Sequence, residues 1–217
     1  PKPGEISLAT GGILFLDELP EFSRAALETL RQPLEDREVT VSRVEATVTY
    51  PANFQLVAAM NPCPCGHFPD LARCRCTEGQ ITRYLQKISG PLLDRIDLCV
   101  EASPVTYGDV RGGGENEASG AIRARVEQAR EIQKERFMEE NIRCNGEMAG
   151  RHIRKYCVLG KEEETFMEEI FEKLALSARM HDRILKVART TADLAGESKI
   201  RLSDLCEAVS YVKSREK

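Results

Sequence analysis

The chain has 217 residues, of which 41% are hydrophobic and 30% are charged, values typical of a soluble globular protein. The net charge is −4, so no overall positive field marks a nucleic-acid binder, and any contact with DNA has to come from a local basic feature. No apolar run approaches the roughly 20 residues that span a bilayer, and the N-terminus lacks the pattern of a signal peptide, so we expect a cytoplasmic protein with no membrane partner.

The first hundred residues alternate between strand and helix signals, which indicates an α/β fold. Ile13 to Leu16 is apolar without alternation, so we expect this strand to be buried on both faces, as in a parallel sheet. Alternating Val and Thr residues around Arg43 predict a hairpin with Arg43 near its tip. In chain order we expect a strand at 13–16, a helix from Ser23 to about Leu34, a hairpin over 38–50, a strand over 54–60, a helix over 80–89 and a short third strand over 98–101.

The composition changes after Pro104. Gly112, Gly113 and Gly114 lie among polar residues and predict a flexible break. Beyond it the apolar spacing is helical, and we expect helices over 119–137, 161–174, 179–194 and 203–212, the last with Ser203 as its N-cap. We therefore predict a partial α/β core at 1–104, a linker at 105–118 and a helical lid bundle at 119–217.

Two acids follow the first predicted strand. Ile13 to Leu16, then Asp17 and Glu18, form the Walker B pattern of nucleotide-hydrolysing proteins. Ligands of open α/β sheets bind at the carboxyl ends of the strands. Asp17 is thus placed to hold Mg²⁺ through water, and Glu18 to polarise the water that attacks the γ-phosphate of ATP. The alternative is a buried strand followed by a helix-capping carboxylate.

Asn61 ends the next predicted strand. A side-chain amide there can hold the attacking water near the γ-phosphate, the role called sensor 1, although an Asn before Pro62 also commonly forms a turn. Arg95, flanked by Asp94 and Asp97, suits an arginine finger that stabilises the transition state in a neighbouring subunit. The alternative for Arg95 is a local salt bridge with these two acids.

Two further arginines are candidates for contacts with the nucleotide. Arg179 follows Ser177 at the start of a predicted helix, where an Arg can act as sensor 2, whereas an Arg on a helix surface is often only solvated. Arg83 is a weaker candidate for a role like that of Arg95.

Four of the eight cysteines fall within fourteen residues. Cys63, Cys65, Cys74 and Cys76 form two C-x-C pairs that can converge on a Zn²⁺ ion, and His67 is a possible replacement for one thiolate. Four thiolates leave no open coordination position, so such a metal would be structural. The alternatives are a loop of reduced cysteines and a redox disulfide. The remaining cysteines, at 99, 144, 157 and 206, are expected to be small, semi-buried hydrophobic residues.

These motifs resemble those of one family of ATPases. The chain is similar to the Mg-chelatase-like AAA+ proteins of the ComM/YifB family over nearly its whole length, through the segments PGEISLATGGILFLDELPEF, LETLRQPLEDREVTVSR, LVAAMNPCPCG, ITRYLQKISGPLLDRIDL and SARMHDRILKVARTTADLAG. The resemblance implies a ring homo-hexamer that uses ATP and Mg²⁺. It also implies a DNA helicase or branch-migration activity in natural transformation, with single-stranded or branched DNA as partner. Arg43 would then point toward the DNA in the ring pore, the alternative being a solvated turn charge.

The chain departs from this family at one motif. The phosphate-binding sequence GxxxxGK followed by Ser or Thr is absent from the 217 residues. We therefore expect a C-terminal fragment that binds ATP weakly or not at all and does not hydrolyse it. Two alternatives stay open, which are a non-enzymatic docking module of a AAA+ ring and a chelatase-type subunit.

Overall fold

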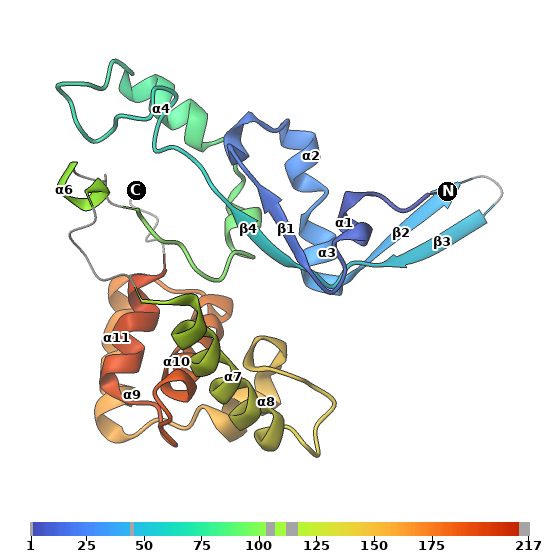
Figure 1. The fold of residues 1–217 in the computed structure, drawn as a ribbon, viewed down its shortest axis with the longest axis vertical. Coiled ribbons are helices and arrows are strands. Elements are labelled where there is room, and N and C mark those ends of the chain that lie inside the picture. The colour runs from blue at the N-terminus through green and yellow to red at the C-terminus, as the bar shows by residue number, and fades with distance from the viewer. Residues whose placement is uncertain (1, 44–45, 103–106, 112–116, 213–217) are drawn as a thin grey trace. The chain divides into compact units, whose positions relative to one another are not determined.

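A computed structural model describes residues 2–43, 46–102, 107–111 and 117–212. The chain folds as two compact units, the first ending at Ile96 and the second beginning at Asp97 (Figure 1). The first contains both strand pairs and the second is helical. The predicted fold class, an α/β core followed by a helical part, is confirmed. Among the described residues, no helix combines the length and the apolar composition that crossing a membrane requires.

The first unit is built on a parallel pair of strands. β1 (Ile13–Leu16) pairs with β4 (Gln55–Ala58), and the register aligns Ile13 with Gln55 and Leu16 with Ala58. The connection between them passes through the short helices η1 (Leu19–Glu21), α2 (Arg24–Glu28) and α3 (Arg31–Asp36) and then a hairpin. Helix α1 (Glu5–Leu8) precedes β1, and helices α4 (Glu78–Leu85) and α5 (Gly90–Leu93) follow β4. Parallel pairing brings the carboxyl ends of the two strands to the same edge.

One face of this strand pair meets the core. Leu14 and Leu16 pack against a buried cluster of Leu19, Leu27, Leu30, Ile88 and Leu92. The other face is open within the described part of the chain, where Ile13 is 63% exposed and Phe15 57% exposed. The expectation that this strand is buried on both faces is therefore wrong here. A two-stranded pair covered by helices on one side gives the alternating burial of a half-buried strand.

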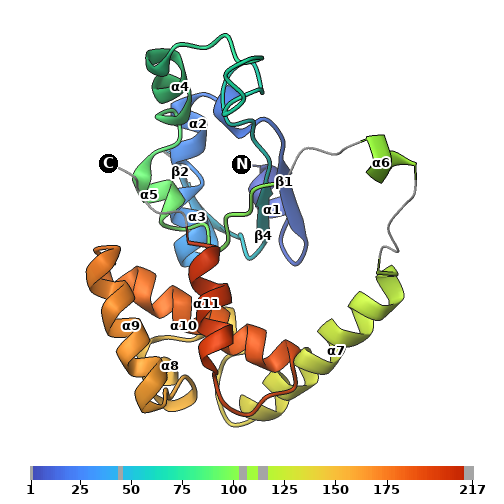
Figure 2. The same ribbon diagram turned by 90° about the vertical axis from the view of Figure 1, so that its left-hand side faces the viewer.

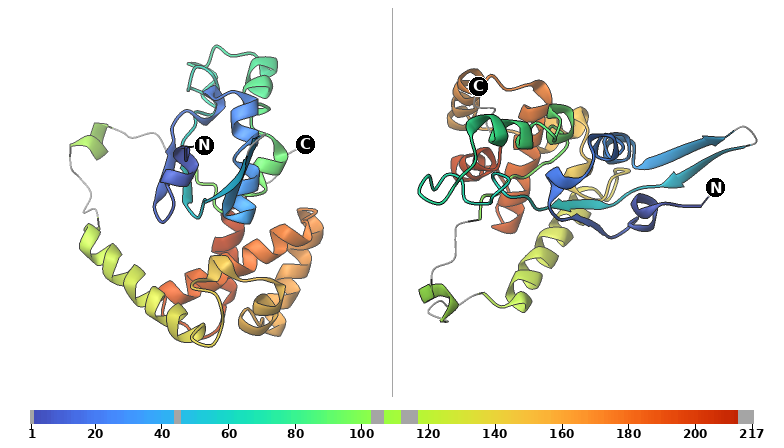
Figure 3. Two further views of the ribbon diagram at one scale, coloured as in Figure 1. Left: turned by 90° about the vertical axis from the view of Figure 1, so that its right-hand side faces the viewer. Right: turned by 90° about the horizontal axis from the view of Figure 1, so that it is seen from above.

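Two further details of the first unit differ from the sequence prediction. The helix predicted from Ser23 to Leu34 is two helices, because Pro33 has no backbone N–H with which to continue the ladder. Ser23 does cap the first of them, accepting a bond of 3.2 Å from the backbone N–H of Ala26. The predicted hairpin is confirmed. β2 (Glu38–Arg43) and β3 (Ala46–Pro51) pair antiparallel with Arg43 opposite Ala46, and the pair extends away from the rest of its unit (Figure 3).

The third predicted strand, at 98–101, does not form. These residues have no strand assignment, and Leu98 and Val100 are exposed. The backbone N–H of Cys99 instead donates to the carbonyl of Tyr211, at 3.0 Å. A strand needs a neighbour to bond, and the described residues provide this segment with none.

The second unit packs around one central helix (Figure 2). Helix α10 (Ala178–Leu194) contacts α7 (Ser119–Arg136), α8 (Gly150–Tyr156) and α11 (Leu202–Ser210). Its residues Ile184, Leu185 and Ala188 are buried in a core that also contains Leu205. Helix α9 (Lys161–Lys173) contacts α11, η2 (Asn145–Glu147) contacts α10, and the short α6 (Tyr107–Val110) lies inside the predicted linker. Residues 112–114 of that linker lie outside the described part of the chain.

Caps explain two differences in this unit. The N-cap of α11 is Arg201 rather than Ser203, because the carboxylate of Asp204 accepts the backbone N–H of Arg201 at 2.8 Å. Helix α8 is missing from the sequence prediction. Its N-cap is Ala149, whose backbone N–H donates to the ring Nδ1 of His152 at 3.0 Å, and no Ser, Thr, Asp or Asn marks that start.

Candidate functional site

The two Walker B acids lie at the carboxyl edge of the parallel strand pair. Asp17 and Glu18 follow β1 directly, and Asn61 comes three residues after the end of β4. The pairing continues past the strands, since the N–H of Leu19 donates to the carbonyl of Ala59 at 3.0 Å. All three polar residues are exposed. The structure thus brings the ends of the two predicted strands together, and it leaves two carboxylates and an amide open to solvent at one edge.

The turn after β1 is a tight one. Glu18 has a φ of 49°, in the left-handed region that non-glycine residues rarely adopt. Its N–H donates to Oδ1 of Asp17 at 2.9 Å. The chain then returns to the core at Leu19 and Pro20, both of which are buried. A residue held in this region costs about 1–3 kcal/mol, and such strain is concentrated at functional sites.

Tyr84 of α4 is a site residue that the sequence reasoning missed. Its side chain is buried. The pKa of its phenol is raised, mainly by burial and also by the negative charges of Glu21 and Glu18. An interaction with the Asn61 backbone acts in the opposite direction and lowers this pKa. Tyr84 therefore lies between the acidic turn and the end of β4. Its one sequence signal is its position on the inner face of a helix that directly follows the cysteine-rich loop.

Arg95 is held by partners within its own unit. One guanidinium nitrogen, Nη1, donates to the carbonyl of Pro91 at 2.8 Å, and Nη2 donates to the carboxylate of Glu35. Its side chain is only 16% exposed, and its Nε is buried with no hydrogen-bond partner in the described part of the chain. The alternative interpretation of Arg95 from the sequence was a local salt bridge with Asp94 and Asp97. The ion pair that the structure gives Arg95 is with Glu35, and Asp97 pairs with Arg183 at 3.4 Å.

The other predicted arginines lie on three different elements. Arg83 is exposed in the last turn of α4, and Arg43 is the last residue of β2. Arg179 is exposed in the first turn of α10, behind the N-cap Ser177, whose hydroxyl accepts from the N–H of Met180 at 3.3 Å. Arg179 belongs to the second unit, so its predicted role at the nucleotide stays a prediction.

The four clustered cysteines converge. Their sulfur atoms all lie within 4.8 Å of one another, although the two C-x-C pairs are separated by eight residues. Cys63 Sγ lies 3.4 Å from Cys65 Sγ and 3.8 Å from Cys74 Sγ, and the distance between Cys65 Sγ and Cys74 Sγ is 3.6 Å. The backbone N–H of Phe68 donates to Cys63 Sγ at 3.4 Å. The arrangement is a set of four thiols around one point, with Cys63 buried.

The thiols of this cluster differ in their pKa values. Backbone N–H groups of His67 and Arg75 lower the pKa of Cys65 to about 6, whereas burial raises the pKa of Cys76 to about 12. Neighbouring thiolates repel one another, so four of them ionise together only when a cation is present. His67 is exposed and contributes its backbone N–H to the cluster.

The scattered cysteines are structurally ordinary. Cys157 is buried, and burial raises the pKa of its thiol to about 11. Cys99 and Cys144 are half-buried. Cys206 is exposed, which corrects the expectation that all four are at least partly buried.

Comparison with known proteins gives matches along both units. The family model described as magnesium chelatase, subunit ChlI, matches residues 1–110, and the model described as the C-terminal part of the same subunit matches residues 116–212. The chain is 48% identical to Competence protein ComM of Haemophilus influenzae and 46% identical to the uncharacterized protein YifB of Escherichia coli, in each case over 212 residues. It is 39% identical over 210 residues to an uncharacterized protein of Mycobacterium tuberculosis. Each match covers 97% of this chain and 41% of the relative, so the chain spans less than half the length of these relatives.

Proposed function

The chain belongs to the magnesium chelatase ChlI family, and on that premise we propose that it is the C-terminal part of an ATP-dependent AAA+ motor of the ComM type that moves or remodels DNA. The observation that carries the proposal is the position of Asp17, Glu18 and Asn61 at one edge of two paired parallel strands. That edge is where nucleotides bind in open α/β folds. The mixed α/β core with a helical C-terminal part is consistent with a partial AAA+ fold.

The residues present fit Mg²⁺ and a nucleotide phosphate. Exposed carboxylate and amide oxygens are the ligands that Mg²⁺ prefers, and Asp17 would hold the ion. The ion supplies neutralising charge for the phosphates when bound. Glu18 would orient and polarise the attacking water, and Asn61 would hold that water by its amide.

The charge on the transition state would be met by arginines. Arg95 is proposed as the finger that contacts the γ-phosphate bound to the next subunit of a homo-hexameric ring. In the single chain Glu35 holds its guanidinium, and phosphate oxygens of the neighbour would take over that role. Arg179 is proposed as sensor 2.

DNA is proposed to contact the hairpin. The net charge of −4 offers no broad attraction for a polyanion, so contact depends on local features. The hairpin β2–β3 extends from its unit and carries Arg43 as the last residue of β2, and residues 44–45 lie outside the described residues (Figure 1). A cation at such a projecting end is placed to contact the phosphate backbone without reading bases.

The four clustered cysteines are proposed to hold a structural Zn²⁺. A Zn–S bond of about 2.3 Å in tetrahedral geometry separates the sulfur atoms by about 3.8 Å. The three separations given above, from 3.4 to 3.8 Å, are close to this value. Four thiolates leave no position for substrate, so this metal would take no part in hydrolysis.

The test of the motor proposal is ATP turnover by this chain and by a version extended upstream with a Walker A segment. We expect no turnover from the chain alone, because it carries no phosphate-binding loop. We expect DNA-stimulated turnover from the extended version, abolished by Glu18→Gln and retained by Glu5→Gln, which removes an exposed charge from α1. Turnover by the chain alone, or full activity of Glu18→Gln, would contradict the proposal.

A docking module is the second candidate, since these 217 residues carry Asp17, Glu18 and Arg95 but no phosphate-binding sequence. Such a module would join rings of intact subunits and add no turnover of its own. Addition of this chain to the extended version separates the readings. Dose-dependent inhibition of the extended protein by the chain favours a docking role, and unchanged turnover argues against it. Nothing in the described residues favours a chelatase substrate.

A further inference from the structure

The loop that carries the four cysteines joins two parts of the proposed nucleotide site. It begins just after Asn61 and ends just before Thr77, the N-cap of α4. Cys63 is two residues beyond Asn61, and Cys76 directly precedes Thr77. The ligands therefore include a residue near each end of the loop. A metal bound to both would hold these ends together, because it removes the freedom that an open loop of this length keeps.

The turn that follows the first pair of cysteines lies beside Asn61. Gly66 has a φ of +79°, and its N–H donates to the carbonyl of Cys63 at 3.0 Å, which closes a tight turn. A Cβ added at Gly66 would lie 3.8 Å from both Cγ and Oδ1 of Asn61. A single added methyl group on the turn would thus touch the side-chain amide that is proposed to hold the attacking water.

The second pair leads directly into α4. Thr77 and Gln80 form a reciprocal cap, with the N–H of Thr77 donating to Oε1 of Gln80 at 2.9 Å and the N–H of Gln80 donating to Oγ1 of Thr77 at 3.3 Å. This cap fixes the start of the helix relative to Cys76. Tyr84, two turns further on, is buried, and the ammonium of Lys87, which lies 5.8 Å from the centre of its ring, pairs with Glu21 at 3.7 Å, so the ring lies near the acidic turn.

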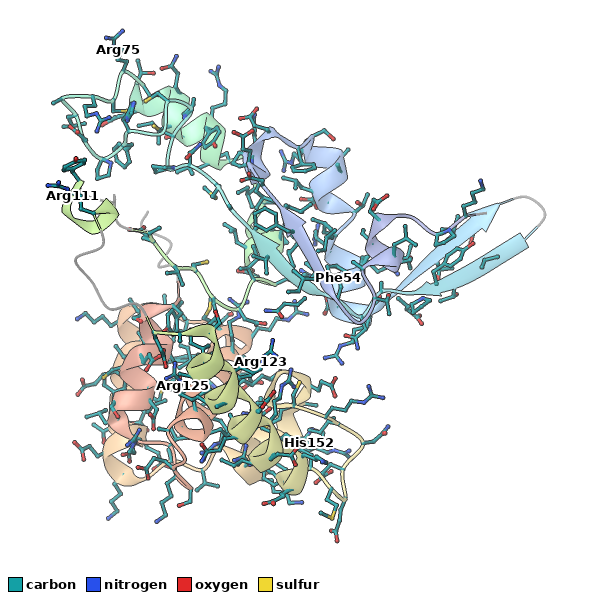
Figure 4. All side chains as sticks on the ribbon, viewed as in Figure 1. Phe54, Arg75, Arg111, Arg123, Arg125 and His152 are labelled. Carbon is teal, nitrogen blue, oxygen red and sulfur yellow. The ribbon has the colours of Figure 1, made fainter. Side chains whose placement is uncertain are left out.

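We propose that the metal-bound cysteine loop is a clasp that positions Asn61 and Tyr84 at the acidic edge, so that occupancy of the metal site controls the order of the nucleotide site. The inference rests on the proposed Zn²⁺ and ATPase functions. The members of the clasp are positioning residues, since they act through Asn61 and Tyr84. Arg75, which lies between the ligands Cys74 and Cys76, points away from the unit and leaves the interior of the loop to the thiols (Figure 4).

Without the metal, the loop keeps its own turn bonds, such as that from the N–H of Cys74 to the carbonyl of Asp70 at 2.7 Å, and the weak bond from the N–H of Phe68 to Cys63 Sγ. The two C-x-C pairs then meet through thiol contacts, 3.8 Å between Cys63 Sγ and Cys74 Sγ and 3.6 Å between Cys65 Sγ and Cys74 Sγ, which hold the ends of the loop less firmly than bonds to a metal would. The turn at Glu18 and the cap at Thr77 are then no longer held in place through the metal. Local opening is expected in 59–61 and 77–86, while α10, whose residues Ile184, Leu185 and Ala188 are buried in the core of the second unit, keeps its protection.

The experiment uses the chain itself, reduced and loaded with Zn²⁺. Native mass spectrometry gives the stoichiometry, and amide hydrogen exchange is then compared before chelation, after chelation and after Zn²⁺ is restored. We expect one Zn²⁺ per chain. We also expect exchange at 59–61 and 77–86 to accelerate at least tenfold on chelation, to recover on reloading, and to stay constant in α10. Loading with Co²⁺ should give the intense thiolate-to-cobalt absorption of a four-sulfur site.

Variants refine the result. Cys65→Ser should lose the metal and show the exchange of the chelated chain, and Cys65→His should restore metal and protection, because Cys₃His sites also bind Zn²⁺. Cys206→Ser is the matched control, since it removes an exposed thiol of the second unit and should change neither quantity. Absence of bound metal overturns the inference, and so does metal-dependent exchange confined to 62–76. None of these readouts uses ATP, so failure of the clasp and failure of the ATPase proposal are distinguishable.

Discussion

Arg136 and Asp193 form an ion pair with two hydrogen bonds that joins α7 to α10. Nη1 of Arg136 donates to Oδ2 of Asp193 at 2.7 Å, and Nη2 donates to Oδ1 at 2.5 Å. The carboxylate also accepts from Nε of the buried Arg189 at 3.0 Å and from Nδ2 of Asn145 at 2.8 Å. Asp193 is fully buried, so one carboxylate links two helices and η2 inside the second unit.

Loss of the Asp193 carboxylate should strongly destabilise the second unit. Asp193→Ala leaves the guanidinium of Arg189 buried without its charged partner, and breaking a buried pair in this way typically costs about 3–5 kcal/mol. The measurement is urea unfolding followed by the helical circular dichroism signal. Glu197→Gln removes an exposed carboxylate that pairs with Arg201, and it should cost about 1 kcal/mol or less. Equal losses in the two variants would refute the assigned role of Asp193.

Glu140 should give the second unit an acid-sensitive stability. Hydrogen bonds from Lys155, at 2.8 Å, and from Tyr156, at 3.0 Å, lower the pKa of Glu140 from 4.5 to about 2. A carboxyl whose pKa is lower in the folded state stabilises the fold fully above its unfolded pKa. That stabilisation disappears as the pH falls from 4.5 toward about 2.

The corresponding measurement is the melting temperature between pH 7 and pH 2, a range that brackets the titration of Glu140. Glu140→Gln should melt below the unmodified chain at neutral pH, and the gap should close as the pH falls below 4.5. Glu139→Gln removes the adjacent exposed carboxyl and should follow the unmodified chain throughout. A gap that is independent of pH would show that Glu140 acts through packing rather than charge.

The sequence predicted elements and motifs better than it predicted their partners. The hairpin, the strand pair and the cysteine cluster follow from local patterns, since alternation, apolar runs and C-x-C spacing are all read within a few residues. The prediction of a third strand at 98–101 was wrong because a strand forms only beside another strand, and none of the described strands pairs with this segment. Phe15 was expected to be buried and is exposed for a similar reason, because the burial of a side chain depends on which elements cover its face of the strand pair.

Partners far apart along the chain were beyond local reasoning. Glu35 and Arg95 are sixty residues apart, and the acids next to Arg95 in the sequence were the natural alternative. Tyr84 was missed because its role comes from the approach of α4 to the turn at Glu18. Both contacts depend on the tertiary fold rather than on any motif.

The proposed finger should act between subunits. In the protein extended with a Walker A segment, Arg95→Ala should reduce ATP turnover by roughly 10³-fold or more, the loss expected when an arginine finger is removed. Mixing Arg95→Ala subunits with Glu18→Gln subunits should restore part of the activity, because one type supplies the acid and the other the arginine at a shared interface. Arg154→Ala, which removes an exposed arginine of α8, is the control and should retain turnover. Failure of the mixture to recover activity would place Arg95 in its own subunit's site.

Arg43 should contribute a phosphate contact to DNA binding. Each phosphate neutralised on a single strand contributes about −0.7 to the slope of log affinity against log salt. Arg43→Ala in the extended protein should therefore weaken binding to single-stranded oligonucleotides of any sequence and make the slope shallower by about this amount. Arg75→Ala removes the same charge from the exposed cysteine loop and leaves the hairpin intact. Equal weakening by the two variants would mean that DNA senses only the charge of the unit, whereas a loss specific to Arg43→Ala would place the strand at the hairpin.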